Sequence, residues 1–146
     1  MIKSWSRSGL WPDEKSKDQI TMISADRFCR RKMLTLDSGK EVMLTLEKVV
    51  GFRDNDGLEL ENGDWVRIKS AKEDVIDIVS KNDKHHSLLS WHLGNRHLAI
   101  ELINKKIIRI EKDHVIALML EGLGARLEYK KEVFNPELGA YGSKHH

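Results

Sequence analysis

The sequence predicts an α+β protein in which a small all-β unit is followed by a βαββαβ domain. In the first half, short apolar runs alternate with closely spaced turn residues, a pattern typical of hairpins. From about residue 73, strand-like segments alternate with two segments of helical periodicity. A chain of 146 residues with 40% hydrophobic content can bury one core or two small ones. We therefore place a domain boundary near residue 72.

The composition argues against several classes of function. The 25 Lys and Arg residues are balanced by 23 Asp and Glu, and no block of one sign offers a face for nucleic acid. Cys29 is the only cysteine, which excludes an intrachain disulfide and a thiolate zinc cluster, so metal chemistry would depend on the seven histidines. The sequence has neither a leader-like apolar segment nor a run of about 20 apolar residues, so we expect a cytoplasmic protein with no membrane segment.

The amino-terminal half, residues 1–72, is predicted to be a small β domain. Residues 1–19 mix tryptophans and charges without a clear period, and we expect an arm or a first loop there. A hairpin is expected over residues 28–46, with its turn at 37–40, where Asp, Ser and Gly favour a turn. Further short strands are expected at 20–23, 58–60 and 65–68, with turns at 54–57 and 61–64.

The second half, residues 73–134, is predicted to form the βαββαβ domain. This order is the ferredoxin-like arrangement, with both helices on one face of a four-stranded antiparallel sheet. Residues 135–146 are expected to form a flexible tail that ends in His145 and His146. The four strands of the domain are expected at 75–79, 97–102, 106–110 and 127–133.

Both predicted helices carry capping residues. Asn82 or Asp83 can cap the first helix and Asp113 the second, because short polar side chains accept hydrogen bonds from first-turn N–H groups. Gly94 and Gly124 are expected to end the helices, since glycine readily takes the left-handed conformation that closes a helix. The residues expected to face inward are Leu88 and Leu89 in the first helix and Val115, Ile116, Leu118, Met119 and Leu123 in the second.

Two histidines, His92 and His97, bracket the joint at which the first helix ends and the next strand begins. A histidine on such a joint is held by rigid elements, and a neutral imidazole is the commonest transition-metal ligand among side chains. We expect His92 in the last helical turn and His97 at the head of the strand. The alternatives are core packing for His92 and an ordinary surface histidine for His97.

His114 follows Asp113 at the amino-terminal end of the second helix. The positive end of the helix dipole disfavours a charged imidazolium there, which leaves a lone pair free for a metal ion. The alternative is a first-turn histidine that meets solvent. Glu101 and Asp113 are candidates for orienting an imidazole, against simple surface charge and helix capping. His85 and His86 are assigned to a solvated helix face.

Five short segments follow one another in a recognisable order: HLGNRH at 92–97, DHV at 113–115, LGA at 123–125, FNPE at 134–137 and GAY at 139–141. Together they resemble the urease accessory protein UreE family, a family of nickel metallochaperones. The carboxyl-terminal half carries the resemblance. The amino-terminal half is similar in kind, because the family has there a small β domain thought to bind protein partners.

The resemblance implies that His97 is the principal nickel ligand, that two copies meet across a homodimer axis, and that His145 and His146 complete the site. His114 is a further candidate ligand and His92 an auxiliary one. The resemblance also implies a cytoplasmic carrier, not an enzyme, that delivers Ni²⁺ to urease apoprotein through accessory proteins that include a GTPase. Cu²⁺ and Zn²⁺ are further expectations in vitro, because imidazole sites do not favour nickel intrinsically.

Two other functions stay open at the level of sequence. A histidine-metal hydrolase would need three ligands, an open coordination position and a carboxylate base, and the sequence has no HExxH motif to support it. A protein-interaction adaptor would bind partner peptides through the β unit, with the second domain only dimerising and the histidines incidental. Nickel binding distinguishes the carrier from the adaptor.

Overall fold

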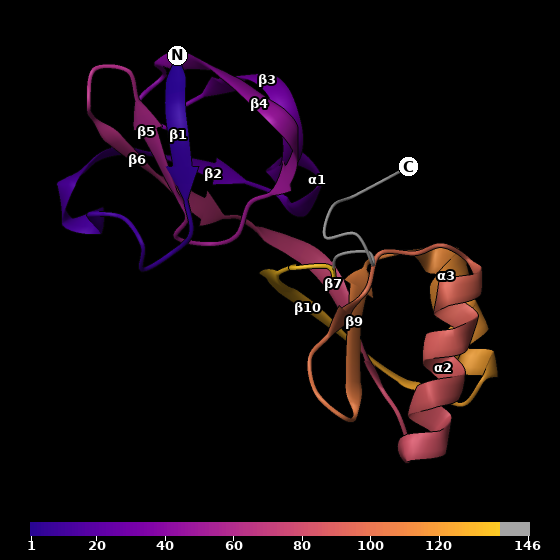
Figure 1. Ribbon diagram of the computed structural model, residues 1–146. Coiled ribbons are helices and arrows are strands. Elements are labelled where there is room, and N and C mark those ends of the chain that lie inside the picture. Colours follow the sequence, from indigo (N-terminus) through magenta and orange to yellow (C-terminus); the bar gives the residue numbers. More distant parts are fainter. Residues whose placement is uncertain (138–146) are drawn as a thin grey trace. The chain divides into compact units, whose positions relative to one another are not determined.

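The computed structural model describes residues 1–137, which form two compact units (Figure 1). The first unit is Met1–Ala71 and the second is Lys72–Glu137 as far as the described residues extend. Each unit has its own cluster of buried apolar side chains. The two are described separately below.

The first unit is built from a four-stranded sheet and a hairpin. The sheet has the order β1-β5-β6-β2, in which β2 and β6 are parallel and the other neighbours antiparallel. The predicted hairpin is present as the pair β3–β4. The elements are β1 (Ile2–Ser6), a 3-10 turn (Asp13–Lys15), β2 (Ser16–Met22), α1 (Ser24–Arg27), β3 (Phe28–Thr35), β4 (Glu41–Gly51), β5 (Gly57–Leu60) and β6 (Trp65–Ser70).

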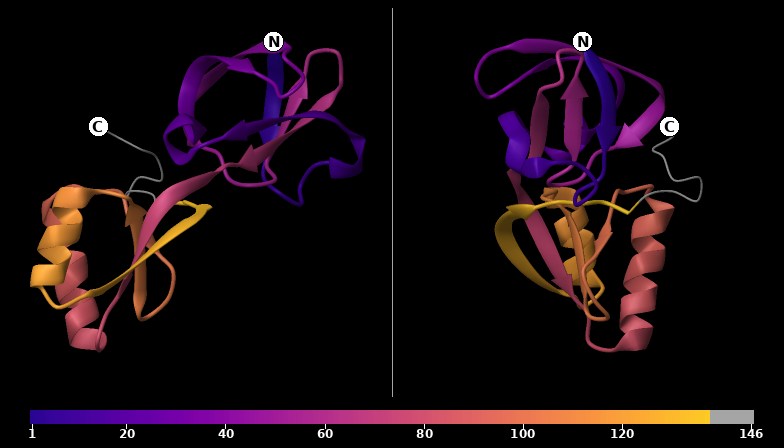
Figure 2. Two further views of the ribbon diagram at one scale, coloured as in Figure 1. Left: turned by 180° about the vertical axis from the view of Figure 1, so that it is seen from behind. Right: turned by 60° about the vertical axis from the view of Figure 1, so that its left-hand side comes forward.

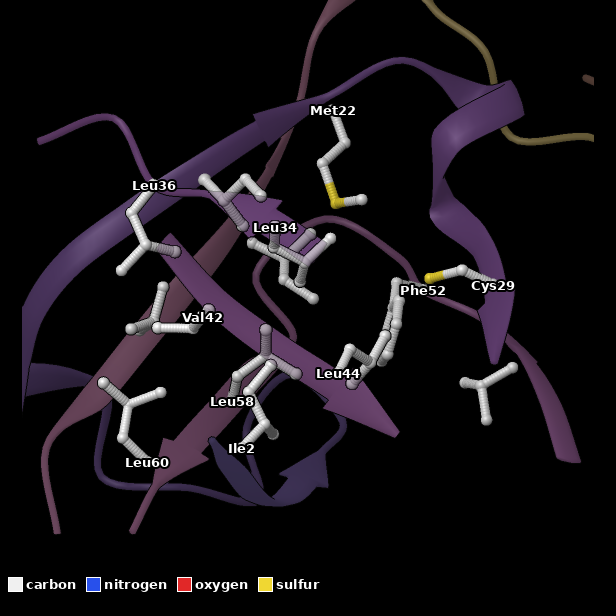
Figure 3. Close-up of a cluster of buried hydrophobic side chains, with 14 residues drawn as sticks. Ile2, Met22, Cys29, Leu34, Leu36, Val42, Leu44, Phe52, Leu58 and Leu60 are labelled. Atoms are coloured by element: carbon white, nitrogen blue, oxygen red, sulfur yellow. The ribbon is translucent and has the colours of Figure 1, made fainter. Parts of the chain in front are cut away.

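The core of this unit lies between the hairpin and the sheet. Leu34 of β3 and Leu44 of β4 are buried together with Ile2 of β1 and Leu58 of β5, as Figure 3 shows. Buried and exposed residues alternate along much of β2 and β4, which is the pattern of a strand with one face in a core. The hairpin and the sheet therefore depend on each other for burial of their apolar faces.

The prediction of an arm or loop over residues 1–19 is wrong. Ile2–Ser6 pairs with β5, and the Trp11 side chain is only 7% exposed. Trp11 Nε1 donates a hydrogen bond of 2.9 Å to the Asn55 carbonyl oxygen, and its ring lies against Gly57, where a side chain would overlap it. The segment is ordered through contacts with residues about 44 to 58 positions away, which local periodicity does not reveal.

The second unit has the predicted ferredoxin-like topology, and the α+β fold class is confirmed. Its antiparallel sheet has the order β10-β7-β9-β8. Both helices lie on the same side of this sheet (Figures 1 and 2). The elements are β7 (Lys72–Val79), α2 (Asp83–Asn95), β8 (Glu101–Leu102), β9 (Ile107–Glu111), α3 (His114–Gly122) and β10 (Arg126–Val133).

The helices begin where capping residues predict. The Asn82 side chain accepts a hydrogen bond from the His85 backbone N–H at 2.8 Å, so Asn82 and not Asp83 is the cap of α2. The Asp113 side chain accepts from the Ile116 backbone N–H at 3.0 Å and caps α3. The helices bury side chains against the sheet through Leu89, Leu93, Ile116, Ala117 and Leu120, which meet Ile76, Ile78, Ile108 and Ile110.

Part of the predicted inward-facing set is wrong. Leu88, Val115 and Leu118 are exposed, and so is Trp91, at 61%. Leu88 and Trp91 are three residues apart on α2, as Val115 and Leu118 are on α3, so each pair lies on one face of its helix. The apolar stripe in the sequence of each helix is therefore wider than the part of it that packs against the sheet. Within the described residues, α2 and α3 each carry an apolar face that is exposed.

The end of α2 differs from the prediction that Gly94 closes it. Gly94 and Asn95 are helical, and His97 takes the left-handed conformation, with φ of 56°. The His97 N–H donates to the Gly94 carbonyl at 3.0 Å and the Leu98 N–H to the Leu93 carbonyl at 3.4 Å. This pair of bonds is the Schellman motif. His97 therefore sits in a helix-closing turn and not at the head of β8.

Helix α3 ends in the same way, with glycine at the equivalent position. Gly124 has φ of 82°, and its N–H donates to the Glu121 carbonyl at 3.0 Å. The Ala125 N–H donates to the Leu120 carbonyl at 3.1 Å. Glycine takes this conformation without a steric cost, whereas an L-residue with a Cβ atom pays about 1–2 kcal/mol. His97 thus occupies a position at which glycine is the more stable choice.

An ion cluster lies within the sheet of the second unit. The Asp77 side chain is 2% exposed, and its carboxylate receives Arg109 Nε at 2.7 Å, Arg109 Nη2 at 3.1 Å and Lys130 Nζ at 3.2 Å. Burial alone raises the pKa of Asp77, but the hydrogen bonds from Arg109 and Lys130 outweigh it and hold that pKa below its ordinary value. The cluster joins the strands β7, β9 and β10.

We predict that Asp77→Ala lowers the free energy of unfolding by about 3 kcal/mol, because Arg109 is left without its buried counter-ion. The matched control is Arg126→Ala on β10, which breaks an exposed pair with Glu128 at 3.4 Å and should cost less than about 0.5 kcal/mol. Urea denaturation of both variants measures the difference. Similar losses in the two variants would contradict a structural role for the cluster.

The second prediction concerns the left-handed turn. His97→Gly should raise the free energy of unfolding by about 1 kcal/mol, because glycine removes the steric cost of a positive φ. His97→Val is the opposing control and should lower it, since a β-branched residue tolerates this conformation poorly. Thermal and urea unfolding of the two variants test this. The idea fails if glycine and valine shift stability in the same direction.

Candidate functional site

A surface hollow of about 650 Å³ lies where α2 ends, and it contains both histidines of the predicted joint. His92 and His97 line it, with the Trp91 ring packed edge-on against His92 at a centroid distance of 4.9 Å. The hollow is therefore part polar and part apolar. The other lining residues are Asn95, Arg96, Leu98, Ile116 and Met119.

His97 combines a fixed backbone with an exposed side chain. Its turn is held by the two Schellman bonds, and the next residue, Leu98, packs against the core that contains Leu93. Strained backbone of this kind persists where the surrounding structure over-determines it, and it concentrates at functional sites. The arrangement presents an imidazole to solvent from a rigid corner, which suits a metal ligand.

His114 is the first residue of α3 and is exposed. It does not line the hollow that contains His97, although Ile116, two residues further along, does. The Asp113 carboxylate beside it accepts from the Ile116 N–H and serves as the helix cap. The structure thus brings His92 and His97 to one hollow and leaves His114 outside its lining.

His145 and His146 lie outside the described residues, but the chain that leads to them is held in place. The Asn135 N–H donates to Glu101 Oε1 at 2.9 Å, and the Glu137 N–H donates to the Ile100 carbonyl at 2.7 Å. Glu137 Oε2 in turn accepts from the Leu102 N–H at 3.1 Å. Residues 135–137 are therefore anchored, in contrast to the free tail expected from 135 onward. Glu101 binds this backbone, a role the sequence did not indicate.

His85 and His86 are half-buried and hydrogen-bonded, so the prediction of a solvated face is wrong for them. His85 Nδ1 accepts from the Lys81 N–H at 2.9 Å, and Nε2 donates to the Leu123 carbonyl at 2.8 Å. His86 Nδ1 lies 3.2 Å from Ser80 Oγ. Both ring nitrogens of His85 are occupied, and this imidazole joins the start of α2 to the end of α3.

Within residues 1–137, no group of three or more His, Cys, Asp or Glu side chains is arranged to hold a metal ion. Cys29 is buried in the first unit, and that burial raises the pKa of its thiol to about 11, which disfavours the thiolate form that binds metals.

Across the same 137 residues, none of the helices has the length and apolar character needed to cross a bilayer.

Comparison with known families matches both units. The family described as "UreE urease accessory protein, N-terminal domain" matches residues 4–71, and "UreE urease accessory protein, C-terminal domain" matches residues 73–146. The two matches together span most of the chain and meet near residue 72. Both halves therefore match the same family. This includes the amino-terminal half, which contains none of the five short motifs of the resemblance.

Individual relatives give the same result. The urease accessory protein UreE of Agrobacterium fabrum is 42% identical over 140 residues, which cover 96% of this chain and 86% of that protein. The corresponding protein of Rhizobium meliloti is 41% identical over 88% of this chain and 82% of its own. Urease accessory protein UreE 1 of Brucella suis is 36% identical over 91% and 82%. With this identity over nearly its whole length, the chain belongs to the UreE family of urease accessory proteins.

Proposed function

We propose that this accessory protein, which is not an enzyme, is a nickel metallochaperone that carries Ni²⁺ in the cytoplasm to the urease maturation machinery. The observation that carries the proposal is the exposed His97 imidazole, held on a strained helix-closing turn in a member of the UreE family. Glycine at this position would make the protein more stable. We therefore infer that histidine is present because its side chain binds a partner. A metal ion is the partner that an exposed neutral imidazole fits best.

We further propose that His97 of two copies shares one ion across a homodimer axis. A two-fold axis brings a residue near it opposite its own copy, so one position supplies two ligands. The exposed apolar residues of α2 and α3 support this arrangement, because Trp91 borders the same hollow as His97. Covering Leu88, Trp91, Val115 and Leu118 with a second copy would bury an apolar surface next to the two imidazoles.

The remaining candidate ligands are assigned to supporting roles. His145 and His146 are assigned as additional ligands of the shared ion, and His114 as a further site at the start of α3. His92 lines the hollow and is an auxiliary ligand. Cu²⁺ and Zn²⁺ are expected to bind the same imidazoles in vitro, because selectivity for nickel in the cell must come from geometry and supply.

In this proposal the two units have different functions. Residues 73–134 carry metal binding and dimerisation, and residues 1–72 bind protein partners. Delivery requires a receiving complex, which we take to be urease apoprotein with its accessory proteins, including the GTPase. An ion held by a few ligands near the surface can be transferred in steps, as one ligand of the carrier is replaced by one of the receiver.

We predict that His97→Gly abolishes the tightest nickel site while the dimer persists. Because glycine suits the backbone at this position, loss of binding would reflect the missing imidazole and not a damaged fold. Calorimetry should find about one tightly bound nickel per dimer in the parent protein. Sizing chromatography checks the dimer.

The matched control is His92→Ala, which removes an imidazole from the same hollow and should weaken binding only modestly. Tight nickel binding that survives in His97→Gly would overturn the assignment of the site. A parent protein that binds no nickel would favour the adaptor instead.

A pH dependence also follows from an all-imidazole site. Protons compete with the metal for the ring nitrogen, so nickel affinity should fall as the pH is lowered from about 8 to about 5.5. Binding should be strongest at the upper end, where fewest protons compete with the metal. Titrations at several pH values, with sizing at each, measure the trend. An affinity that stays constant across this range would show that other ligands dominate.

A further inference from the structure

One end of the second unit, here called the basic end, carries four exposed lysines. Arg126 of β10 and Ile107 of β9 both pair with Val79, the last residue of β7, so these strands share one end of the sheet. The connections at that end are residues 80–82, 103–106 and 123–125. The lysines of the basic end are Lys81, Lys84 in the first turn of α2, Lys105 and Lys106.

Hydrogen bonds hold the three connections of the basic end together. Ser80 donates to the Lys106 carbonyl through its N–H at 2.8 Å and through its hydroxyl at 2.9 Å. Asn104 Oδ1 accepts from the Lys106 N–H at 2.8 Å. His85 is hydrogen-bonded to the backbone of the first connection and of the third. The backbone segments that carry the lysines are therefore fixed relative to one another.

The positive charge of the basic end is not neutralised within the part of the chain that the structure describes. None of the four lysines forms an ion pair with a described residue, whereas Arg126 at the same end is paired with Glu128 at 3.4 Å. The other acidic residues at this end are Asp83 and Glu121, and both are exposed. Four cations against two carboxylates leave an excess of positive charge, although the whole chain is nearly balanced.

The mixture of charges indicates what kind of partner fits the basic end. Nucleic acids and anionic membranes present dense negative charge, which Asp83 and Glu121 would repel. A protein can place single carboxylates opposite the lysines and away from these two acids. Leu102, which is 50% exposed and precedes the second connection, adds an apolar contact of the kind that protein interfaces contain. An acidic protein surface is therefore the best fit.

The basic end lies at the opposite end of α2 from the hollow that contains His97. Lys84 is in the first turn of the helix, and His97 follows its last residue by two positions. The helix has 13 residues and is therefore about 20 Å long. A protein that contacts the basic end leaves the hollow open for transfer of an ion.

We propose that the basic end is a docking surface for an acidic surface on the protein that receives nickel. This inference rests on the proposed function. Complementary charges at an exposed surface raise the rate of encounter and fix the orientation of the two partners. The lysines thus bring the receiving complex to the carrier, while the ion is held at the other end of α2.

The test measures association of the nickel-loaded full chain with a purified complex of urease apoprotein and its accessory proteins, by biolayer interferometry. Lys84→Gln/Lys105→Gln removes two charges from the basic end. The matched control, Lys72→Gln/Lys131→Gln, removes two exposed lysines near the opposite end of the sheet, where Lys72 pairs with Val133. We expect about 3- to 10-fold weaker binding in the first pair, chiefly through slower association, and less than about 2-fold in the control.

Glu121→Gln is the variant of opposite sign. It removes a carboxylate from the basic end and should strengthen binding to the receiving complex about 2-fold. Raising the salt concentration from about 50 mM to about 300 mM should weaken binding of the parent more than binding of Lys84→Gln/Lys105→Gln. Calorimetry should find the same nickel affinity in all of these variants, because none of the substitutions touches the hollow.

Three results would overturn the inference: a parent chain that does not bind the complex, equal losses in the two lysine pairs, or an unchanged salt dependence in Lys84→Gln/Lys105→Gln. Vesicles of phosphatidylserine and phosphatidylcholine are the probe for a membrane. If they bind the parent but not this lysine pair, the protein partner is refuted.

The outcomes also separate this inference from the proposed function. If His97→Gly leaves nickel binding intact, the proposed site fails whatever the basic end binds. If His97→Gly abolishes nickel binding and Lys84→Gln/Lys105→Gln binds the receiving complex as the parent does, the docking inference alone is refuted.

Discussion

The left-handed turn at His97 is the constraint on which the rest of the candidate site depends. It exists because two hydrogen bonds close α2 and because Leu98 packs into the core together with Leu93. These contacts outweigh the steric cost of a Cβ atom at positive φ. The backbone of His97 is thereby fixed to the end of α2 and, through Leu98, to the core of the second unit. A ligand on a mobile loop loses backbone conformational entropy each time it binds a metal ion. At His97 this entropy is lost during folding, so it does not oppose binding.

Residues 134–137, which follow β10, are also held by contacts with residues distant in sequence. The buried pair Asp77–Arg109 holds the end of β10, and Glu101 and Glu137 hold the segment that follows. Glu137 is thus hydrogen-bonded to Ile100, which lies about 40 positions earlier in the sequence. The ion cluster inside the sheet and the hydrogen bonds at its edge therefore hold residues 133–137 from β10 to β8.

Sequence patterns predicted the order of elements in the second unit because its strands and helices have distinct periods and clear amino-terminal caps. The end of α2 could not be predicted in the same way. Gly94 has the stronger local preference for a left-handed turn, yet the docking of Leu98 decides where the helix closes. The ordered strand Ile2–Ser6 and the anchoring role of Glu101 were missed for a related reason, since both depend on partners distant in sequence. The prediction that His92 and His97 lie at one corner agrees with the structure, because the two are close in sequence at the end of one helix.

A shared site has a thermodynamic consequence that a site within one chain lacks. If an ion is bound by His97 from two copies, nickel binding and dimerisation are linked, and each strengthens the other by the same factor. The apolar faces on α2 and α3 then contribute to metal affinity although they carry no ligand. Affinity in the proposed carrier thus depends on both an interface and a strained turn. A receiving partner that loosens either of them weakens the binding of the ion without competing directly for His97.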